Sequence, residues 1–263
     1  MLRSRLATLT LGLASAIASV IALATPAQAA STVRYVALGD SYASGVGAGN
    51  ESGSCRRSPN AYPSLWATAN APASYTFVAC SGATTQSVLD TQVGYLSTGT
   101  TLVSITVGGN DVGFSDVMTT CVVNGESACI AAVNAAEDKA RRELPPKLDN
   151  VYKAIRARAP SARVVVIAYP VFYKLDTFCA GLSQNSRAKI NEGINLLDDL
   201  TKNATVQNSF VFADVRPIFR GNELCAYGEK WLHALNWADT SISYHPTAAG
   251  QSGGYYPTFR AAA

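Results

Sequence analysis

The stretch ALGDSYASGVGAG, residues 37–49, follows an apolar run and then breaks into alternating glycines. It carries one acid, Asp40, and it fits three descriptions: a phosphate-binding loop, a turn that presents a catalytic serine, or a plain connection between a strand and a helix. The dinucleotide-binding pattern requires Gly-x-Gly-x-x-Gly and an acid about twenty residues later. Position 50 is Asn and no acid lies near position 70, so the sequence argues against a nucleotide-binding loop.

The first 29 residues have the organisation of a secretory signal peptide. Arg3 and Arg5 form a basic start, residues 6–24 are apolar or small and uncharged, and residues 27–29 read Ala-Gln-Ala, a small-x-small cleavage pattern. A membrane anchor is the alternative, because about twenty apolar residues can span a bilayer. The cleavage pattern favours export, and we therefore expect a secreted, extracellular protein that begins near residue 30.

The remaining chain, residues 30–263, is long enough for one domain with a sizeable core. Loss of Arg3 and Arg5 leaves 19 basic and 18 acidic residues, so the net charge is close to zero. This balance gives no reason to expect nucleic acid as a partner. We see no internal repeat and no second long apolar run, and we expect a monomer.

The cysteines indicate disulfide bonds. Export, an even count and wide spacing predict three bonds among 15 formal pairings. We favour the sequential pairing, because each bond then closes one loop: Cys55–Cys80, Cys121–Cys129 and Cys179–Cys225. The spacing Cys-x-x-Cys is absent and only two histidines occur, so we expect no metal site.

Strand-like and helical runs alternate along the chain. The strand-like runs are residues 33–38, 75–79, 102–107, 163–168 and 210–213. The helical runs are residues 61–70, 127–159 with an interruption at Pro145-Pro146, 183–203 and 247–259. Strands that are apolar on both faces belong to parallel sheets covered on both sides. We therefore predict an α/β fold, a three-layer α/β/α sandwich with a central parallel five-stranded sheet.

Three of these strands are followed by residues suited to chemistry: Gly39-Asp40-Ser41, Cys80-Ser81-Gly82 and Gly108-Gly109-Asn110-Asp111. Ligands of parallel sheets bind beyond the carboxyl ends of the strands, so these loops are expected to converge. Together they offer a hydroxyl, a backbone N–H at a glycine and a side-chain amide. Acyl transfer requires this combination of a nucleophile and donors for an oxyanion.

A serine nucleophile also needs a base, and only His233 and His245 are available. His233 lies among apolar and aromatic residues and is better explained as a structural residue. His245 lies in a polar loop directly before Pro246, and catalytic groups are often found on such loops. We therefore take His245 as the candidate base.

The order of Gly-Asp-Ser, a middle glycine, Gly-Gly-Asn-Asp and a C-terminal His-Pro resembles the SGNH hydrolases, also called GDSL esterases and lipases. The resemblance covers residues 33–256 and is closest to secreted actinobacterial lipases and phospholipase A-type enzymes. It implies a flavodoxin-like fold, hydrolysis of lipid acyl esters, a lipid or a lipid–water interface as the partner, and no cofactor. It also implies that Ser41 is the nucleophile, that His245 is the base, and that the oxyanion hole is formed by the backbone N–H groups of Ser41 and Gly82 and the side chain of Asn110.

The sequence departs from this family at the group that orients the histidine. The family usually has Asp three residues before the His, and here that residue is Ile242. A backbone carbonyl can also accept the imidazole N–H, and such Ser-His dyads occur in the family. We therefore expect the carbonyl of Ile242 or Ser243 to orient His245, with Asp239 and Asp214 as weaker alternatives.

Some residues have competing interpretations. Residues 250–254, GQSGG, match the Gly-x-Ser-x-Gly elbow, but no strand precedes them and no acid or His follows. We interpret them as a turn or helix irregularity. Ser44 is an alternative nucleophile, but it would lie one helical turn beyond Ser41 and away from the strand end, so we discount it. Asp40 and Asp111 are interpreted as loop and cap residues.

The substrate is the most open question. A carbohydrate acetylesterase or a short-chain esterase could use the same residues. A non-enzymatic alternative is a secreted carbohydrate-binding module, with Trp66, Trp231 and Trp237 as a sugar platform. Aromatic residues are equally ordinary core material.

Overall fold

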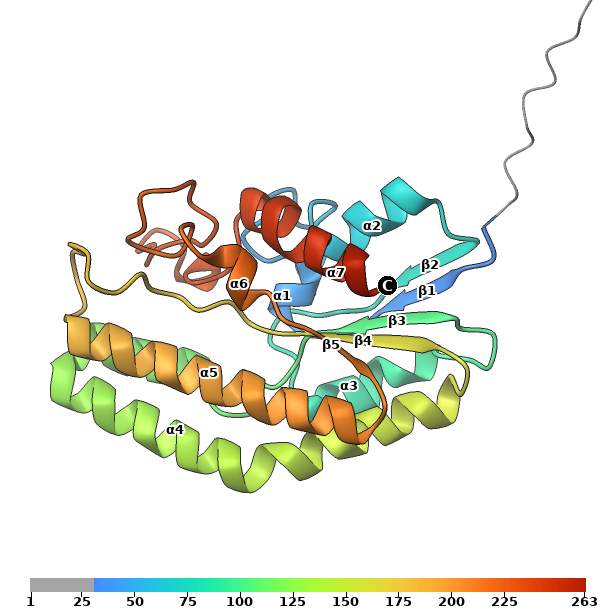
Figure 1. Cartoon of the computed structure of the whole chain (residues 1–263), viewed down its shortest axis with the longest axis horizontal. Coiled ribbons are helices and arrows are strands. Elements are labelled where there is room, and N and C mark those ends of the chain that lie inside the picture. The colour runs from blue at the N-terminus through green and yellow to red at the C-terminus, as the bar shows by residue number, and fades with distance from the viewer. Residues whose placement is uncertain (1–30) are drawn as a thin grey trace, which may run out of the picture. The chain divides into compact units, whose positions relative to one another are not determined.

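The computed structural model describes residues 31–263, so the predicted signal peptide, residues 1–29, lies outside the described part of the chain. Five parallel strands form one sheet in the order β2-β1-β3-β4-β5 (Figure 1). Their bounds are β1 Arg34–Ala37, β2 Ser74–Phe77, β3 Leu102–Ile105, β4 Arg163–Ile167 and β5 Val211–Ala213. This is the flavodoxin-like order, in which the chain changes direction across the sheet between β1 and β3.

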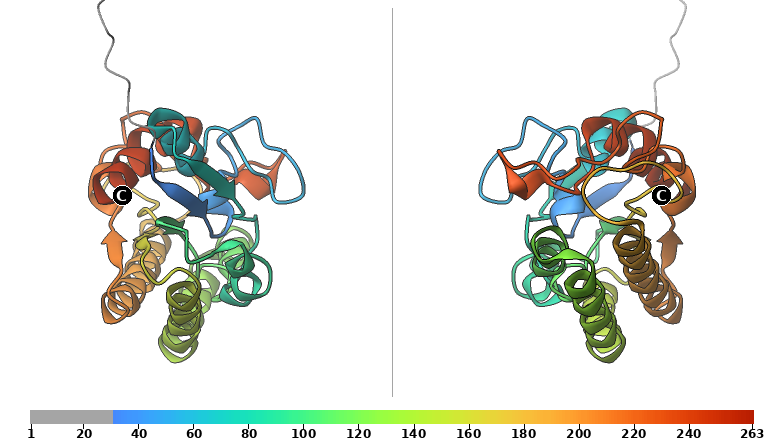
Figure 2. Two further views of the ribbon diagram at one scale, coloured as in Figure 1. Left: turned by 90° about the vertical axis from the view of Figure 1, so that its right-hand side faces the viewer. Right: turned by 90° about the vertical axis from the view of Figure 1, so that its left-hand side faces the viewer.

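Helices cover both faces of the sheet, which confirms the predicted three-layer α/β/α fold (Figures 1 and 2). One face carries α3 Thr85–Thr91, α4 Phe114–Arg158 and α5 Gln184–Gln207. The other carries α2 Tyr62–Asn70, the π-helix η3 Gly250–Tyr255 and α7 Tyr256–Ala262. The short elements are α1 Ser41–Ser44, η1 Val93–Tyr95, α6 Arg216–Phe219 and η2 Thr240–Ile242. None of the described helices is long and apolar enough to span a membrane.

The core lies on both faces of the central strands. Residues 102–105 of β3 and 164–167 of β4 are all buried, and each buried Val or Ile side chain contributes about 1.5–3 kcal/mol relative to exposure. On the α7 side, the ring of Tyr35 packs against Trp66, Tyr75 and Phe259. This double-sided burial explains why the strands are apolar runs and not alternating sequences.

The long element α4 is two helical segments that meet at Gly125; the second agrees with the start of the predicted helix over residues 127–159 and differs from it in the middle. It begins at Phe114, turns at Gly125 (φ 79°, ψ −178°), and then runs through Pro145 and Pro146. The prediction that the proline pair interrupts it was therefore wrong. A proline inside a helix costs about 3 kcal/mol, and the buried apolar face of this segment offsets that cost with Leu144, Leu148, Val151, Tyr152 and Ile155.

The C-terminal helix also differs in detail from the prediction. The predicted helix over residues 247–259 is a π-helix over Gly250–Tyr255 that continues as α7 to Ala262. Gln251 is buried within the π-helix; its Oε1 accepts from the Tyr62 N–H (2.9 Å) and its Nε2 donates to the Tyr42 carbonyl (3.0 Å). The GQSGG stretch is thus a helix irregularity, and its Ser252 is exposed.

The six cysteines form the three sequential pairs. Cys55–Cys80 joins the loop after α1 to the loop after β2. Cys121–Cys129 spans the turn of α4 at Gly125, and Cys179–Cys225 joins the connections that follow β4 and β5. Two of these bonds therefore fix loops at the carboxyl end of the sheet, where the candidate site lies.

Candidate active site

The residues named from the sequence meet at the switch point of the sheet. Ser41 begins α1 directly after β1, Gly82 follows β2, and Asn110 follows β3. All three line one pocket of about 200 Å³ together with His245. The order β2-β1-β3 makes these three loops neighbours, which is why the pocket forms where the chain reverses direction.

A tight turn presents Ser41. Gly39 has φ +130°, and a Cβ there would lie 2.5 Å from the Thr106 carbonyl oxygen, so only glycine fits. Gln92 holds this glycine, since its Oε1 accepts from the Gly39 N–H (2.8 Å) and its Nε2 donates to the Gly39 carbonyl (2.9 Å). Asp40 caps α1 by accepting from the Tyr42 N–H (3.0 Å). The Ser41 side chain is thereby fixed at the pocket floor.

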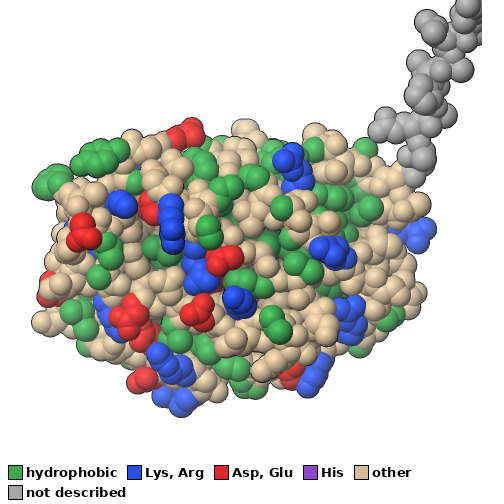
Figure 3. All heavy atoms as spheres, in the orientation of Figure 1, with side chains coloured by type: hydrophobic (Ala, Val, Ile, Leu, Met, Phe, Trp, Pro, Cys, Tyr) green, Lys and Arg blue, Asp and Glu red, His purple; other side chains and the backbone are tan. Residues whose placement is uncertain are grey.

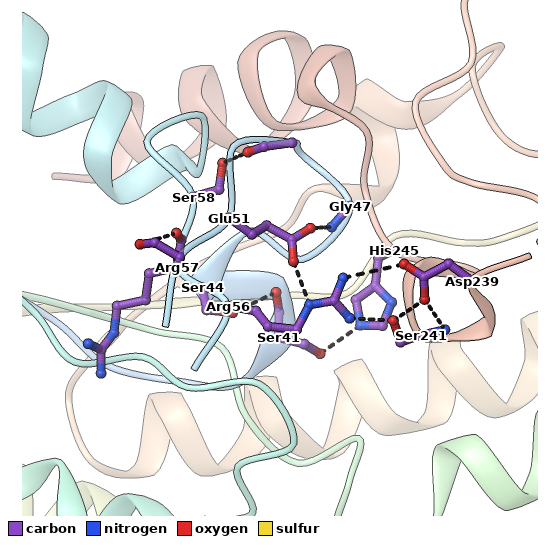
Figure 4. Close-up of polar contacts among 12 residues, drawn as sticks. Ser41, Ser44, Gly47, Glu51, Arg56, Arg57, Ser58, Asp239, Ser241 and His245 are labelled. Atoms are coloured by element: carbon purple, nitrogen blue, oxygen red, sulfur yellow. Dashed lines mark hydrogen bonds and ion pairs between the residues drawn. The ribbon is translucent and has the colours of Figure 1, made fainter. Parts of the chain in front are cut away.

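His245 is in direct contact with the serine. Its Nε2 lies 2.7 Å from Ser41 Oγ, and its Nδ1 lies 3.1 Å from the Ser243 carbonyl oxygen (Figure 4 shows the Ser41 contact). Because a carbonyl only accepts, Nδ1 carries the proton and Nε2 presents its lone pair to the serine hydroxyl. Burial lowers the pKa of His245 from 6.5 to about 4; the Ser243 carbonyl opposes this shift and the Arg56 charge adds to it.

No acid orients this imidazole among the residues that the structure describes. The Asp239 carboxylate accepts from the N–H and hydroxyl of Ser241 and faces Arg56 (Nη2–Oδ2 3.8 Å). The Asp214 carboxylate pairs with Arg216 (2.8 Å). Of the two predicted carbonyls, that of Ser243 meets the ring, whereas that of Ile242 accepts from the His245 backbone N–H (3.1 Å).

Two backbone N–H groups and one amide face the same pocket. Within residues 31–263 the amides of Tyr42, Ser81 and Ala83 donate to protein acceptors, whereas those of Ser41 and Gly82 have none there. Gly82 has φ +78° and open space where a Cβ would lie. One of the two N–H groups of Asn110 Nδ2 donates to the Ala83 carbonyl (2.9 Å), and this bond orients the amide. The second N–H group of Nδ2 takes no part in that bond.

Asp40 and Asp111 have structural contacts. Asp111 accepts from the Thr85 N–H (2.9 Å) and hydroxyl (2.6 Å), so it joins the loop after β3 to the start of α3. Asp40 accepts from the Tyr169 hydroxyl, and burial raises the pKa of Asp40 from 3.8 to about 7. The hydroxyl of Ser44 donates to the Ser41 carbonyl (3.3 Å), its side chain is fully buried, and it does not line the pocket that holds Ser41.

Tyr169 is a site residue that sequence reasoning missed. Its hydroxyl donates to Asp40 Oδ2 and accepts from the Gly109 N–H (3.1 Å). Its own backbone N–H donates to the buried Asp198 (2.9 Å). One side chain after β4 therefore fixes the nucleophile turn relative to the loop that carries Asn110. No local motif marks it, because its partners are 60 and 129 residues away in the chain.

Arg56 is a second residue that the sequence analysis did not identify, and it connects two loops beside the site. It lies in the loop after α1, donates to Glu51, and reaches across to Ser241 and Asp239 in the loop before His245 (Figure 4). The Glu51 carboxylate in turn accepts from the Gly47 N–H (2.7 Å). This set of contacts ties the glycine-rich loop to the histidine loop.

His233 lies beside the same loop as a structural residue. Its Nε2 lies 2.7 Å from the Gly47 carbonyl oxygen, and its backbone pairs with the histidine loop through the His233 N–H to His245 carbonyl bond (2.9 Å). The Tyr42 hydroxyl donates to the Tyr244 carbonyl (2.8 Å) and adds a third support. His245 is therefore held by its backbone on both sides.

The tryptophans do not form a common platform. Trp66 is buried in the core against Tyr35, and Trp231 packs edge-on against Phe219. Only Trp237 is largely exposed. A sugar-stacking surface made of the three rings is excluded.

The pocket that holds Ser41 and His245 adjoins two larger cavities. Phe114, Ser115, Ser241 and His245 line both the pocket and an adjoining cavity of about 410 Å³. That cavity shares Val122, Leu235 and Tyr244 with a third of about 850 Å³. Because they share these lining residues, the three mainly apolar cavities adjoin one another between Ser41 and the disulfide-linked loops, and we refer to the two larger ones as the groove.

Comparison with known proteins identifies the family. Residues 37–252 match the GDSL-like Lipase/Acylhydrolase family. The chain is 53% identical to Lipase 1 of Streptomyces coelicolor over 245 residues, which cover 92% of this chain and 91% of that protein. It is 51% identical to a lipase of Streptomyces rimosus over 232 residues, 87% of this chain and 86% of that protein.

Solved structures give the same result. The fold superposes on phospholipase A1 from Streptomyces albidoflavus NA297 with a TM-score of 0.86 at 52% identity, covering 88% of this chain and 99% of that one. An extracellular lipase from Streptomyces rimosus gives a TM-score of 0.86 at 50% identity, covering 88% and 100%. The chain belongs to the GDSL-like lipase and acylhydrolase family, that is, to the SGNH hydrolases, and is a carboxylic ester hydrolase.

Proposed function

We propose that this protein is a secreted hydrolase of lipid acyl esters that works through a Ser41–His245 dyad. The observation that carries the proposal is the 2.7 Å contact between Ser41 Oγ and His245 Nε2 in a pocket that adjoins a mainly apolar groove. Relatives at 50–53% identity are named lipase and phospholipase A1, which supports the lipid substrate class.

In the first half of the reaction, Ser41 Oγ attacks the ester carbonyl carbon and its proton passes to His245 Nε2. The carbonyl oxygen becomes an oxyanion, which the N–H groups of Ser41, Gly82 and the Asn110 amide stabilise. The imidazolium keeps its orientation through the Nδ1–H bond to the Ser243 carbonyl. His245 then gives its proton to the alcohol as the C–O bond breaks.

In the second half, a water molecule attacks the acyl-Ser41 ester and His245 takes a proton from that water. The same three donors stabilise the second oxyanion. Collapse of this intermediate releases the carboxylic acid and returns the proton to Ser41 Oγ. Every step uses one proton shuttle and one set of donors, so the residues of this pocket are sufficient for the cycle.

The groove favours a substrate with an acyl chain. Phe114 stands where the pocket meets the 410 Å³ cavity, and Met118, Val122 and Leu235 continue the apolar wall. Pockets that bind apolar groups use such walls with a few placed polar atoms. A short acetyl group would leave most of this surface empty.

A p-nitrophenyl ester series from acetate to palmitate tests the proposal, with Ser41→Ala as the control. We expect preference for medium or long chains and loss of activity in Ser41→Ala, after which phospholipid and triacylglycerol hydrolysis are compared. Cleavage of acetate alone would favour the carbohydrate acetylesterase alternative. An inert wild-type protein would show that the catalytic assignment is wrong.

Secretion is a separate part of the proposal. Three disulfides in the described chain and an extracellular relative support it. Expression of the full sequence in an actinobacterial host, followed by N-terminal sequencing of protein from the medium, tests it. We expect a new N-terminus near Ala30; full-length protein retained in the membrane would favour the anchor alternative.

A further inference from the structure

Four apolar side chains project into solvent around the end of the molecule that holds the active site. They are the most exposed large hydrophobic residues of the described chain: Tyr227 (94%), Phe178 (92%), Trp237 (72%) and Val123 (66%). Figure 3, in the orientation of Figure 1, shows apolar side chains projecting at the upper left, over the loops coloured orange in Figure 1. We refer to these four residues as the apolar rim.

The chain brings the rim together from distant segments. Val123 lies in the first part of α4, Phe178 follows β4, Tyr227 follows α6, and Trp237 precedes η2. The Cys179–Cys225 bond links the segments of Phe178 and Tyr227, and Val123 lies between the bonded Cys121 and Cys129. Two disulfides therefore hold exposed apolar residues in place at the carboxyl end of the sheet.

The rim adjoins the groove that leads to Ser41. Trp237 and Val123 border the 410 Å³ cavity, which opens into the catalytic pocket at His245. The two bonded cysteines behind Phe178 and Tyr227 line the 850 Å³ cavity that continues the same groove. A surface that covered the rim would lie over the groove entrance.

The charges near the rim indicate what kind of surface fits. Segments 171–183 and 220–247, which carry the three aromatic residues, contain three basic residues and four acidic ones. They are Lys174, Arg220 and Lys230 against Asp176, Glu223, Glu229 and Asp239. Anionic membranes attract clusters of basic residues, and these two segments have no such excess. Exposed aromatic rings prefer the boundary between headgroups and acyl chains.

We propose that the apolar rim docks the enzyme onto the surface of a zwitterionic lipid aggregate, with Phe178, Tyr227 and Trp237 inserted at the headgroup level. This rests on the proposed function, since it names the surface from which that active site takes its lipid. Docking places the groove entrance at the lipid surface, so an acyl chain moves from the aggregate toward Ser41 without crossing bulk water. Binding then depends on apolar contact and changes little with salt.

Trp237 provides a direct readout of docking. Trp66 is buried and Trp231 half-buried, so Trp237 is the tryptophan most exposed to solvent. In the Ser41→Ala background, phosphatidylcholine vesicles are expected to shift the emission to the blue, and brominated phosphatidylcholine to quench it. The shift is expected to be absent in Trp237→Phe.

The decisive variant is Phe178→Ser/Tyr227→Ser, since neither residue lines the pocket or the groove. We expect its Kd for phosphatidylcholine vesicles to rise at least tenfold, while kcat/KM for monomeric p-nitrophenyl butyrate stays within twofold of wild type. Tyr95→Ser is the matched control: Tyr95 is 61% exposed but precedes β3 and so lies at the opposite end of the sheet. Its vesicle binding is expected to be unchanged.

Three outcomes would overturn the docking surface. The first is that the double variant and the Tyr95→Ser control bind phosphatidylcholine vesicles equally well. The second is that the protein binds only phosphatidylglycerol vesicles and loses that binding at 0.5 M NaCl. The third is that the protein does not bind phosphatidylcholine vesicles at all. In each of these cases, Ser41-dependent hydrolysis of p-nitrophenyl butyrate would leave the proposed function intact. Absence of that hydrolysis would instead contradict the proposed function itself.

Discussion

The Nδ1 atom of His245 lies 3.1 Å from the carbonyl oxygen of Ser243, so a neutral backbone group takes the place that a carboxylate occupies in a Ser-His-Asp triad. The Asp239 carboxylate, the acid nearest before His245 in sequence, is turned to Arg56 and Ser241. This arrangement sets the expected effects of mutation and of pH.

Asp239→Asn is expected to lower kcat/KM by less than about fivefold. The Asp239 side chain is 51% exposed and its Arg56 pair is long. Exposed ion pairs at this distance contribute little, so loss of the Asp239 charge is expected to disturb the histidine loop only slightly. Steady-state kinetics on a soluble ester measure the effect, with Ser41→Ala as the reference for full loss. A decrease near the roughly 10⁴-fold that follows neutralisation of a triad acid would contradict the dyad.

The pH dependence of kcat/KM is expected to show an acidic limb near pH 4. His245 must be neutral to accept the Ser41 proton, and burial lowers its pKa from 6.5 to about 4, so the active form persists to lower pH. Activity is measured from pH 3 to pH 8 on a monomeric ester, with circular dichroism at each pH to establish that the protein is folded. Half-maximal activity between pH 6 and 7 in folded protein would contradict the expectation that burial lowers the pKa of His245.

Tyr169→Phe is expected to lower both stability and kcat. The lost hydroxyl leaves the buried Asp40 carboxyl and the Gly109 N–H without this partner, and an unsatisfied buried group costs about 1–3 kcal/mol. We expect kcat to fall more than KM changes, because the nucleophile turn and the Asn110 loop lose their common support. Urea unfolding and steady-state kinetics measure the two effects.

Tyr75→Phe is the control for that change, because the Tyr75 hydroxyl makes one half-buried bond to Ser64 (3.1 Å) on the edge strand β2. It is expected to cost about 1 kcal/mol or less and to leave kcat unchanged. Equal kinetics in the two variants would show that Tyr169 has no positioning role.

The sequence was most informative where a strand ends. Gly39-Asp40-Ser41 and Gly108-Gly109-Asn110 each follow a buried apolar run, and the flavodoxin-like order makes these loops neighbours. Glycine was a usable signal because Gly39 admits no Cβ and Gly82 adopts a left-handed backbone with open space where a Cβ would lie. The fold class and family followed from these local patterns.

The supporting residues could not be found in this way. Gln92 binds the Gly39 backbone from 53 residues away, Tyr169 reaches Asp40 across 129, and Arg56 reaches Ser241 across 185. Such contacts leave no periodicity or spacing in the sequence. The course of α4 was mispredicted for a related reason, since burial against the sheet and α5 outweighs the local effect of Pro145-Pro146.

Gly47→Ala is expected to reduce both stability and activity through His233. Gly47 has φ +86°, and a Cβ there would lie 2.8 Å from the His233 ring and 3.1 Å from the Pro246 carbonyl oxygen. The left-handed backbone costs about 1–2 kcal/mol for any residue with a Cβ, and the contact with His233 adds about 1–3 kcal/mol. Because His233 pairs with the backbone of His245, the displacement is expected to lower kcat as well.

Gly49→Ala separates these two effects. Gly49 has a similar φ of +79°, yet no heavy atom lies within 4 Å of its Cβ position. It therefore incurs the backbone cost alone, and we expect it to lose stability without losing kcat. Urea unfolding and ester hydrolysis of both variants make the comparison. If Gly47→Ala and Gly49→Ala had the same stability and the same rate, packing of the glycine-rich loop against His233 would play no part in positioning His245. The contacts of Arg56 would then be the remaining link between this loop and the histidine loop.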